Sequence, residues 1–292
     1  MASVHVRLMR EDDLHRTERA SDVTFLDGDR IGARVGDPEP EPRSVAGQKE
    51  WIDRMRHFLT VDPGGCWIAV DGDAVVGFAI SQNRDGLWFL ATYGVLPDYQ
   101  RAGIGRRLMD AALAHADGRP GLFSSSVHPG ATRRYRLAGF SLYPQMRMLG
   151  TVDRSTLPAI TGLDEGRADD LAWMDRLDQD VRGAGHGPDH GYLLDTQRLV
   201  VSRENGRPGY VYVDDQGRGT LLAAAHPETA QKLLWEALAS SRGDTLVNCI
   251  TTANEWALDV GLAARLDIGQ EGYIAVRGMK DPAPYLASGH FL

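Results

Sequence analysis

Three arginines and two glycines crowd together where a helix is predicted to begin, in the segment Arg101–Arg107. Gly103 and Gly105 have no Cβ, so the backbone there can approach a bound group closely. The free N–H groups of the first helical turn point toward such a group, and the helix dipole adds roughly half a positive charge. Because the arginines add charge-assisted hydrogen bonds, the segment predicts a site for a phosphate or pyrophosphate.

Two common phosphate-binding motifs do not fit this segment. A Walker loop needs Gly-Lys-Ser/Thr after four intervening residues, and none occurs. A Rossmann fingerprint needs a third small residue where this chain has Leu108. That fingerprint also follows the first strand of its domain, whereas the glycine loop of this chain follows the fourth predicted strand. A Gly-x-Gly pair alone is weak evidence, because an ordinary tight turn into a helix uses the same residues.

Hydrophobic periodicity predicts the elements that position this loop. Leu87–Leu96, directly before it, is almost wholly apolar and is predicted to be a central strand. Asp71-Gly72 lies between two β-rich runs and predicts a hairpin, because Gly accepts the positive φ of a tight turn. The predicted strands are residues 4–10, 66–70, 74–80, 87–96, 121–127 and 141–152, and the predicted helices are 12–25, 45–59, 104–116 and 130–140.

From about Thr151 the same order of elements returns more faintly, as a repeat of architecture rather than of sequence. The predicted helices are residues 165–181, 227–241 and 255–266, and the predicted strands are 197–205, 209–217, 219–225, 244–253 and 272–279. Gly183–Gly191 is predicted to be an inserted loop. The phosphate loop does not recur, since the matching segment reads LLAAAHPETAQKLL, with Pro227 near the helix start.

The string VLPDYQRAGIGRRLM resembles the acyl-CoA loop of the GNAT superfamily of N-acyltransferases, Gln/Arg-x-x-Gly-x-Gly/Ala, with the strand-ending Val before it. GATRRYRLAGF is similar to the Ala…Tyr-x-x-x-Gly-Phe helix of that family, and the strand order is also that of the family. The resemblance covers residues 4 to about 152, and the second half resembles the fold only. It implies two GNAT-like domains of mixed α/β (α+β) class, each a twisted, mixed, mostly antiparallel sheet flanked by helices. Residues 1–150 would bind acyl-CoA, and residues 151–292 would be a degenerate copy with a substrate-pocket or structural role.

The resemblance also implies site residues. The backbone of Val95 and Leu96 would pair with the pantetheine arm of acyl-CoA, and Tyr135 would protonate the departing thiolate. A tyrosine suits that task because its reference pKa near ~10 keeps it protonated at neutral pH. The alternative for Tyr135 is a half-buried aromatic residue that packs a helix. The residues implied to hold the pyrophosphate are Gln100, Arg101, Ala102, Gly103, Ile104, Gly105 and Arg106.

The general base is not identified by the sequence. Many members of the family carry a Glu in the middle of the fourth strand, where this chain has Phe89, Leu90 and Ala91. His128 stands where the family often has Asn. A histidine can remove a proton from an ammonium because its pKa is near neutral. It can equally replace the Asn as a structural hydrogen-bonding residue, and both roles stay open.

Charge is distributed unevenly over the 292 residues. Residues 1–150 carry 19 basic and 19 acidic side chains, whereas residues 151–292 carry 13 and 21. An acidic second half disfavours nucleic acid as a partner and suits a cationic small-molecule amine, although it also simply favours solubility. Asp178, Asp180 and Asp189, which flank the predicted loop, are candidates to face such an amine.

Composition indicates an ordinary globular protein, with 42% hydrophobic and 25% charged residues. No apolar run approaches the ~20 residues that span a bilayer. Cys66 and Cys249 are far apart and are expected to be buried thiols of a cytoplasmic protein. His186, His190 and His226 have no second ligand cluster nearby in sequence, so they are expected to be loop residues and no metal is expected. The oligomeric state, monomer or homodimer, is left open.

These inferences favour an acetyl-CoA-dependent N-acetyltransferase in which an amine attacks the thioester directly. A non-catalytic acyl-CoA sensor or scaffold is the alternative, favoured by the missing strand Glu. A nucleotide-binding oxidoreductase is disfavoured by the place of the glycine loop in the strand order.

Overall fold

The computed structural model describes residues 4–33 and 38–292. Its packing divides the chain into two compact units. Within the described residues, unit 1 comprises the chain through Asn83 together with Trp88–Gly121 and Ser126–Gly139, and unit 2 comprises Arg84–Leu87, Leu122–Ser125 and Phe140–Leu292. The packing therefore assigns residues 140–150 to unit 2, whereas the sequence placed them in the first domain.

Unit 1 contains strands in the order β1-β2-β3-β4. Its hairpin forms as predicted, because Asp71 pairs with Ala74 across the turn at Gly72, which has a φ of 58°. The strands are β1 (His5–Leu8), β2 (Cys66–Asp71), β3 (Ala74–Arg84) and β4 (Leu87–Val95). The last residue of β3 and the first residue of β4 belong to unit 2. The helices are α1 (Leu14–Gly32), α2 (Val45–Val61), α3 (Ile104–Ala116) and α4 (Pro129–Leu137), with 3-10 turns η1 (Glu11–Asp13), η2 (Pro63–Gly65) and η3 (Pro97–Tyr99).

The helices of unit 1 are held by their apolar stripes. α2 buries Trp51, Met55 and Phe58, and the Phe58 ring lies 6.0 Å from that of Phe89 on β4. α3 buries Leu108, which lies where a side chain at Gly77 of β3 would be. Burial of such side chains is the main source of stability, at about 1.5–3 kcal/mol each. This packing of buried side chains fixes the start of α3 relative to the end of β4.

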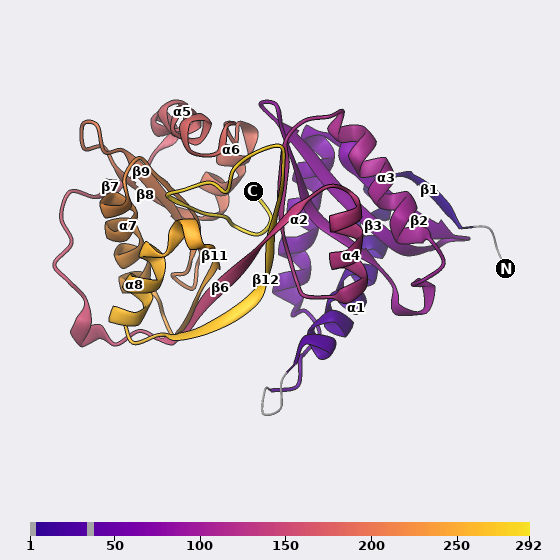
Figure 1. Cartoon of the computed structure of the whole chain (residues 1–292), viewed down its shortest axis with the longest axis horizontal. Helices are drawn as coiled ribbons and strands as arrows, with labels where there is room; N and C mark the ends of the chain where they lie inside the picture. Colours follow the sequence, from indigo (N-terminus) through magenta and orange to yellow (C-terminus); the bar gives the residue numbers. More distant parts are fainter. Residues whose placement is uncertain (1–3, 34–37) are drawn as a thin grey trace. The chain divides into compact units, whose positions relative to one another are not determined.

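Unit 2 contains two sets of strands, in the orders β5-β12-β6-β11 and β13-β10-β9-β8-β7. Figure 1 shows the long antiparallel strands β6 and β12 side by side. The strands are β5 (Gly121–Ser125), β6 (Ser141–Thr151), β7 (Asp164–Glu165), β8 (Arg198–Ser202), β9 (Gly209–Val213), β10 (Gly219–Ala224), β11 (Asp244–Ile250), β12 (Asp267–Arg277) and β13 (Tyr285–Leu286). The helices are α5 (Leu171–Arg182), α6 (Pro188–Thr196), α7 (Pro227–Ser240) and α8 (Trp256–Ala263), with 3-10 turns η4 (Arg154–Thr156), η5 (Ala168–Asp170) and η6 (Thr252–Asn254).

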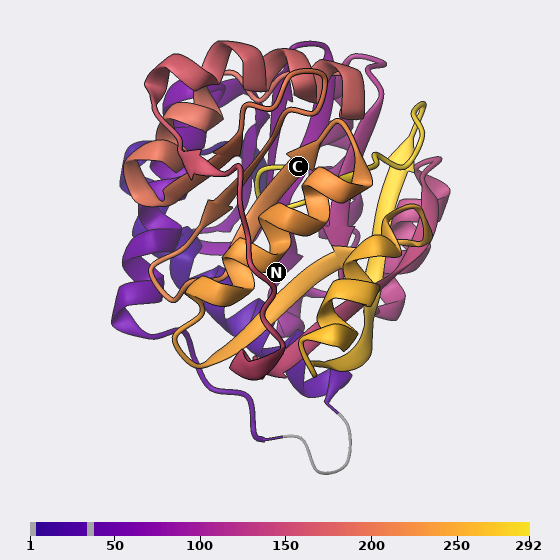
Figure 2. The same ribbon diagram turned by 90° about the vertical axis from the view of Figure 1, so that its left-hand side faces the viewer.

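One hydrophobic core holds unit 2 together. α7 and α8 lie over one face of its strands (Figure 2) and bury Leu233, Leu234 and Val260 against them. None of the helices described in either unit is long and apolar enough to cross a membrane.

The prediction of a loop over Gly183–Gly191 is partly wrong. The chain turns at Gly183, whose φ is 86°, but α6 begins at Pro188. Proline is favoured in the first turn of a helix because its missing N–H has no partner there anyway. The loop is therefore a short connection between two helices.

A short sequence repeat was missed. The segments Arg10–Leu14 and Arg167–Leu171 read REDDL and RADDL. In each, the backbone N–H of the arginine donates to the second aspartate, at 2.9 Å to Asp13 and 2.8 Å to Asp170. The two turns into α1 and α5 are thus built alike, so the repeat extends to sequence as well as to architecture.

Candidate active site

The N-terminus of α3 is open. Gly103 is the N-cap, with a φ of 81° that disfavours any residue other than glycine, and no side chain caps the helix. A Cβ at Gly103 would meet no heavy atom within 4 Å. Because the first-turn N–H groups of a helix have no intrahelical partners, this end of α3 can accept an anion. Arg101, two residues earlier, also has a positive φ, of 64°, which is uncommon outside glycine.

Gly105 has a structural reason to lack a side chain. A Cβ there would lie 2.6 Å from the Tyr93 hydroxyl, so the absent side chain makes room for Tyr93. The Tyr93 hydroxyl donates to the carbonyl oxygen of Gly105 at 2.8 Å. Burial raises the pKa of Tyr93 to about 12. Tyr93 therefore stays protonated and joins the end of β4 to the first turn of α3.

The three arginines of the loop differ in their partners. Arg106 lies 3.5 Å from Asp110 one turn later, and both side chains are largely exposed. Arg107 donates to the carbonyl oxygen of Val4 at 2.9 Å. Exposed ion pairs of this kind contribute at most about 1 kcal/mol. Arg106 can therefore exchange Asp110 for a phosphate at little cost, whereas Arg107 already donates to Val4, the residue before β1.

The backbone at the end of β4 is only partly available. The N–H of Leu96 donates to Val76 at 3.0 Å, and its carbonyl accepts from Tyr99 at 2.9 Å, so both polar groups of Leu96 are already used within the protein. Successive backbone N–H groups of a strand point to opposite edges of that strand. The backbone N–H group of Val95 therefore points away from β3. Gln100 donates from Nε2 to the Val95 carbonyl at 3.2 Å and so holds the turn.

Tyr135 lies on α4 and is 5% exposed. Its ring centroid is 6.2 Å from that of Tyr93, in an edge-on arrangement. Burial, with a smaller effect of Tyr93, raises the pKa of Tyr135 well above its ordinary value. The hydroxyl is therefore a proton donor at neutral pH, and only a strong base generated nearby can remove its proton.

His128 is the N-cap of α4. Its Nδ1 accepts the backbone N–H of Ala131 at 3.4 Å. The neutral ring then carries its proton on Nε2, because Nδ1 is the acceptor. The capping geometry supports the structural role, since a base acting through Nδ1 would have to give up this bond.

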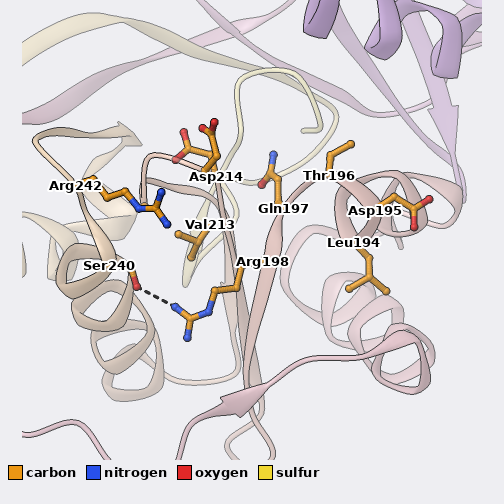
Figure 3. Close-up of a pocket in the computed structure, with 11 residues that line it drawn as sticks. Leu194, Asp195, Thr196, Gln197, Arg198, Val213, Asp214, Ser240 and Arg242 are labelled. Carbon is orange, nitrogen blue, oxygen red and sulfur yellow. Dashed lines mark hydrogen bonds between the residues drawn. The ribbon is translucent and has the colours of Figure 1, made fainter. Parts of the chain in front are cut away.

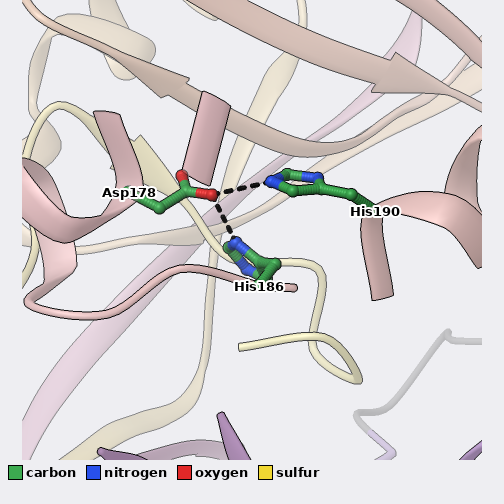
Figure 4. Close-up of side chains that lie close together, drawn as sticks. All are labelled: Asp178, His186 and His190. Carbon is green, nitrogen blue, oxygen red and sulfur yellow. Dashed lines mark hydrogen bonds and ion pairs between the residues drawn. The ribbon is translucent and has the colours of Figure 1, made fainter. Parts of the chain in front are cut away.

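A buried cluster in unit 2 was not predicted. Asp178, His186 and His190 each offer one ligand atom, all within 4.8 Å of one another, and all three are fully buried (Figure 4). The shared carboxylate oxygen Oδ2 of Asp178 lies 2.7 Å from His186 Nδ1 and 2.9 Å from His190 Nε2. The expectation that both histidines are loop residues holds for His186, which lies between α5 and α6, and is wrong for His190, which lies on α6.

The hydrogen bonds around the cluster disfavour a metal ion. Arg182 Nη1, which can only donate, lies 2.6 Å from His186 Nε2, so that nitrogen is the acceptor and Nδ1 carries the proton toward Asp178. A metal bound at Nδ1 would leave the neutral ring with a proton on Nε2, facing the guanidinium. Burial and Arg182 lower the pKa of His186 to about 4, which keeps the ring neutral.

Two tyrosines complete this network. Tyr210 donates to Asp178 Oδ1 at 2.7 Å, and the Tyr212 hydroxyl lies 3.1 Å from His190 Nδ1 and donates to the carbonyl oxygen of His190 at 3.2 Å. Burial alone would raise the pKa of Asp178, but His186 and His190 lower it below its ordinary range. The carboxylate is thus ionised, and it contacts His186, His190 and Tyr210. Buried polar groups of this kind hold a core in one arrangement when all are paired.

The acids expected to attract a cationic amine are mostly buried. Asp178 is enclosed in the cluster, and Asp189 makes two hydrogen bonds, at 2.8 and 2.9 Å, to Arg84, which is 4% exposed. Of the three candidates only Asp180 is exposed. A buried carboxylate paired with a guanidinium exerts little field on solvent.

A polar cavity of about 580 Å³ lies in unit 2 (Figure 3). The guanidinium of Arg198 in its wall is held by Glu165, Glu236 and Ser240. The cavity is lined by Leu194, Asp195, Thr196, Gln197, Arg198, Val213, Asp214, Asp215, Gly217, Ser240 and Arg242. None of these is a residue predicted to bind the cofactor, and the neutralised Arg198 offers little to an anion.

Residues 31–140 match the model of the acetyltransferase (GNAT) family. In sequence, the chain is 32% identical over 149 residues to mycothiol acetyltransferase of Clavibacter michiganensis subsp. michiganensis, a match that covers 46% of this chain and 47% of that protein. The chain thus spans about half the length of this curated relative.

Solved structures share the fold over nearly the whole chain. A structure described as a putative acetyltransferase from Pyrococcus horikoshii aligns with a TM-score of 0.75 at 18% identity, over 98% of this chain and 95% of that one. A tandem GNAT protein from the clavulanic acid biosynthesis pathway aligns with a TM-score of 0.59 at 14% identity, over 96% and 100%. At these identities the likeness is one of fold alone.

Proposed function

We propose, because residues 31–140 match the model of the acetyltransferase (GNAT) family, that the protein is an acyl-CoA-dependent N-acyltransferase that moves an acetyl group from acetyl-CoA to an amine. The observation that carries the proposal is the uncapped N-terminus of α3, where Gly103 adopts a positive φ and faces open space. Such an end binds phosphate groups without any side chain. The match to the curated relative supports the same chemistry.

The cofactor would be held in two places. The pyrophosphate would lie against the N–H groups at the start of α3, with Arg101 and Arg106 at its edge. The pantetheine arm would pair with Val95 rather than with Leu96, since the polar backbone groups of Leu96 are already bonded.

The reaction would proceed by direct attack. The neutral amine nitrogen would form a bond to the thioester carbonyl carbon, the bond from that carbon to sulfur would break, and the nitrogen would lose one proton to water. The N–H of Val95 would polarise the carbonyl, and Tyr135 would give its proton to the departing thiolate. The raised pKa of Tyr135 suits this step, because the hydroxyl is fully protonated until the thiolate forms. Most of the acceleration would come from positioning the two reactants.

The acceptor would be an amine of a small molecule or a peptide. The excess of acidic over basic side chains lies wholly in residues 151–292, which favours an amine that carries positive charge. We place the acyl-CoA in the first half because the second lacks the glycine–arginine loop.

The test is a screen of amine acceptors with acetyl-CoA, read out as release of free thiol. We expect at least one amine to be acetylated, with stoichiometric CoA. Tight binding of acetyl-CoA without transfer to any amine would instead support the sensor, the alternative suggested by the absence of a carboxylate in Phe89–Ala91.

A further inference from the structure

Tyr93 of β4 contacts two parts of the proposed site that both lie within unit 1. Its hydroxyl donates to the carbonyl oxygen of Gly105, in the first turn of α3, at 2.8 Å. Its ring lies edge-on to that of Tyr135 of α4, with the ring centroids 6.2 Å apart. One side chain therefore contacts both the helix that begins at the candidate anion site and the proposed acid.

The start of α3 offers backbone donors without partners. The N–H groups of Ile104, Gly105 and Arg106 make no hydrogen bond among the described residues, as expected for the first turn of a helix. The N–H of Arg106 and the carbonyl of Gly105 belong to the same peptide group. Tyr93 therefore donates to the peptide group whose other end is one of these free donors.

A hydrogen bond to a peptide carbonyl strengthens the donor at the other end of that peptide. The bonded oxygen draws electron density from the amide, which makes the N–H of the next residue more positive, and successive hydrogen bonds polarise one another in this way. In a helix the carbonyl of Gly105 accepts from the N–H of Met109, and its second lone pair accepts from Tyr93. Two hydrogen bonds rather than one thus polarise the N–H of Arg106.

The hydroxyl of Tyr93 is fixed for this role. Gly105 leaves the space for it, because a Cβ at Gly105 would lie 2.6 Å from the hydroxyl oxygen. Burial raises the pKa of Tyr93 to about 12, so the hydroxyl keeps the proton that it donates throughout the neutral pH range. The hydrogen bond to Gly105 is therefore a constant feature of this helix start.

We propose that Tyr93 is a positioning residue for the cofactor, which strengthens the binding of the pyrophosphate of acetyl-CoA through the peptide group that joins Gly105 to Arg106. This inference rests on the proposed function, since it takes the start of α3 as the pyrophosphate site. The packing of Tyr93 on Tyr135 involves its ring and does not need its hydroxyl. Loss of the hydroxyl of Tyr93 therefore lowers the affinity for the cofactor, whereas loss of that of Tyr135 lowers turnover.

The experiment compares two thioesters that differ in the pyrophosphate. Wild type and Tyr93→Phe are titrated by calorimetry with acetyl-CoA and with S-acetylpantetheine, which has the thioester arm but no pyrophosphate. We expect Tyr93→Phe to raise the Kd of acetyl-CoA by roughly threefold to tenfold, the effect of losing one hydrogen bond, and to leave the Kd of S-acetylpantetheine unchanged. At saturating acetyl-CoA, kcat stays within about twofold of wild type, because only ground-state binding is altered.

The matched control is Tyr99→Phe. Tyr99 lies six residues after Tyr93, and its hydroxyl donates to Asp71 of the β2–β3 hairpin at 3.1 Å. We expect Tyr99→Phe to leave the Kd of both thioesters unchanged, because the polarised peptide of α3 is intact in this variant.

Three outcomes overturn the inference and leave the proposed function standing. These are an unchanged Kd of acetyl-CoA in Tyr93→Phe, an equal rise in the Kd of both thioesters, and an equal effect of Tyr99→Phe. If Tyr93→Phe weakens acetyl-CoA alone but the wild type transfers acetyl to no amine, the inference holds and the proposed function is overturned. Failure of the wild type to bind acetyl-CoA overturns both.

Discussion

The helices α3 and α7 hold the same place in the two halves of the chain, yet only one can receive a phosphate. The N-cap of α3 is Gly103, which makes no side-chain cap and faces open space. The N-cap of α7 is His226, which also makes no side-chain cap, but Pro227 replaces one N–H donor and Glu228 lies in the first turn. A carboxylate at that position satisfies the helix dipole and repels an anion. An anion site thus depends on the residues at the helix start and is not a property of the fold.

A second contrast lies in the two sheets. β3 buries Phe78 and Ile80, whereas β9 buries Tyr210 and Tyr212. The hydroxyl groups of β9 are paired with Asp178 and His190. β9 therefore places hydroxyl groups inside unit 2, whereas β3 places apolar side chains inside unit 1. Both units also enclose charged side chains, such as Asp13 in unit 1 and Asp178 in unit 2.

The largest effect is expected from Tyr135→Phe. If Tyr135 is the acid, kcat falls roughly 10²- to 10⁴-fold while the affinity for acetyl-CoA is unchanged, because only a transition-state interaction is lost. Steady-state kinetics and calorimetry measure the two quantities. The matched control is Tyr212→Phe in unit 2, which removes a buried hydroxyl but leaves kcat unaltered. Equal turnover of Tyr135→Phe and wild type would remove Tyr135 from the mechanism.

The buried network makes the stability of unit 2 depend on pH. The pKa of His186 falls from an ordinary 6.5 to about 4 in the fold, so between these values the unfolded chain binds a proton that the folded one does not. The contribution of His186 to the free energy of unfolding is therefore complete above pH 6.5 and is lost as the pH falls toward 4. The loss is about 3 kcal/mol, because a shift of one pKa unit corresponds to about 1.36 kcal/mol.

Urea unfolding at pH 7 and at pH 4.5 measures this loss. We expect the His186→Gln variant to lose much less free energy of unfolding between pH 7 and pH 4.5 than wild type does. This difference does not depend on how stable the variant is at pH 7. A variant and a wild type that lose stability equally over this range would show that His186 does not carry the effect.

Gly103→Asp is expected to weaken acetyl-CoA binding about 10²-fold, close to 2.7 kcal/mol, since it places a carboxylate where phosphate should lie. The readout is the rise in melting temperature on adding acetyl-CoA, which ligand binding produces by mass action. Gly118→Asp is the control, because Gly118 follows the other end of α3 with a similar φ of 75° and similar open space. Equal weakening by both variants would place the cofactor elsewhere.

The smallest effect concerns Asp180, the exposed member of the three acids. If it steers a positively charged acceptor, kcat/KM falls with added salt, and Asp180→Asn reduces this dependence by about twofold or less, because the Debye length is only ~8 Å at physiological strength. The assay is run at saturating acetyl-CoA. A salt dependence that is identical in variant and wild type would show that Asp180 is remote from the acceptor.

The sequence by itself determined the features that arise within a few residues. The glycine loop before α3, the apolar stripe of α2 and the turn at Asp71-Gly72 each follow from local backbone preferences and helical or strand periodicity. The REDDL and RADDL turns were equally local and could have been found, because the aspartate bonds a backbone N–H only three residues away. Such interactions need no knowledge of the remaining chain.

Only the tertiary structure decided which polar side chains are buried and what they contact. The bond between Tyr210 and Asp178 joins residues 32 apart, and that between Arg84 and Asp189 joins residues 105 apart. The space that the missing side chain of Gly105 leaves for Tyr93 could likewise be found only in the folded chain. In sequence an aspartate that faces solvent and one that is enclosed by donors look the same, because burial is set by the packing of distant elements, as the enclosed Asp178 and the exposed Asp180 demonstrate.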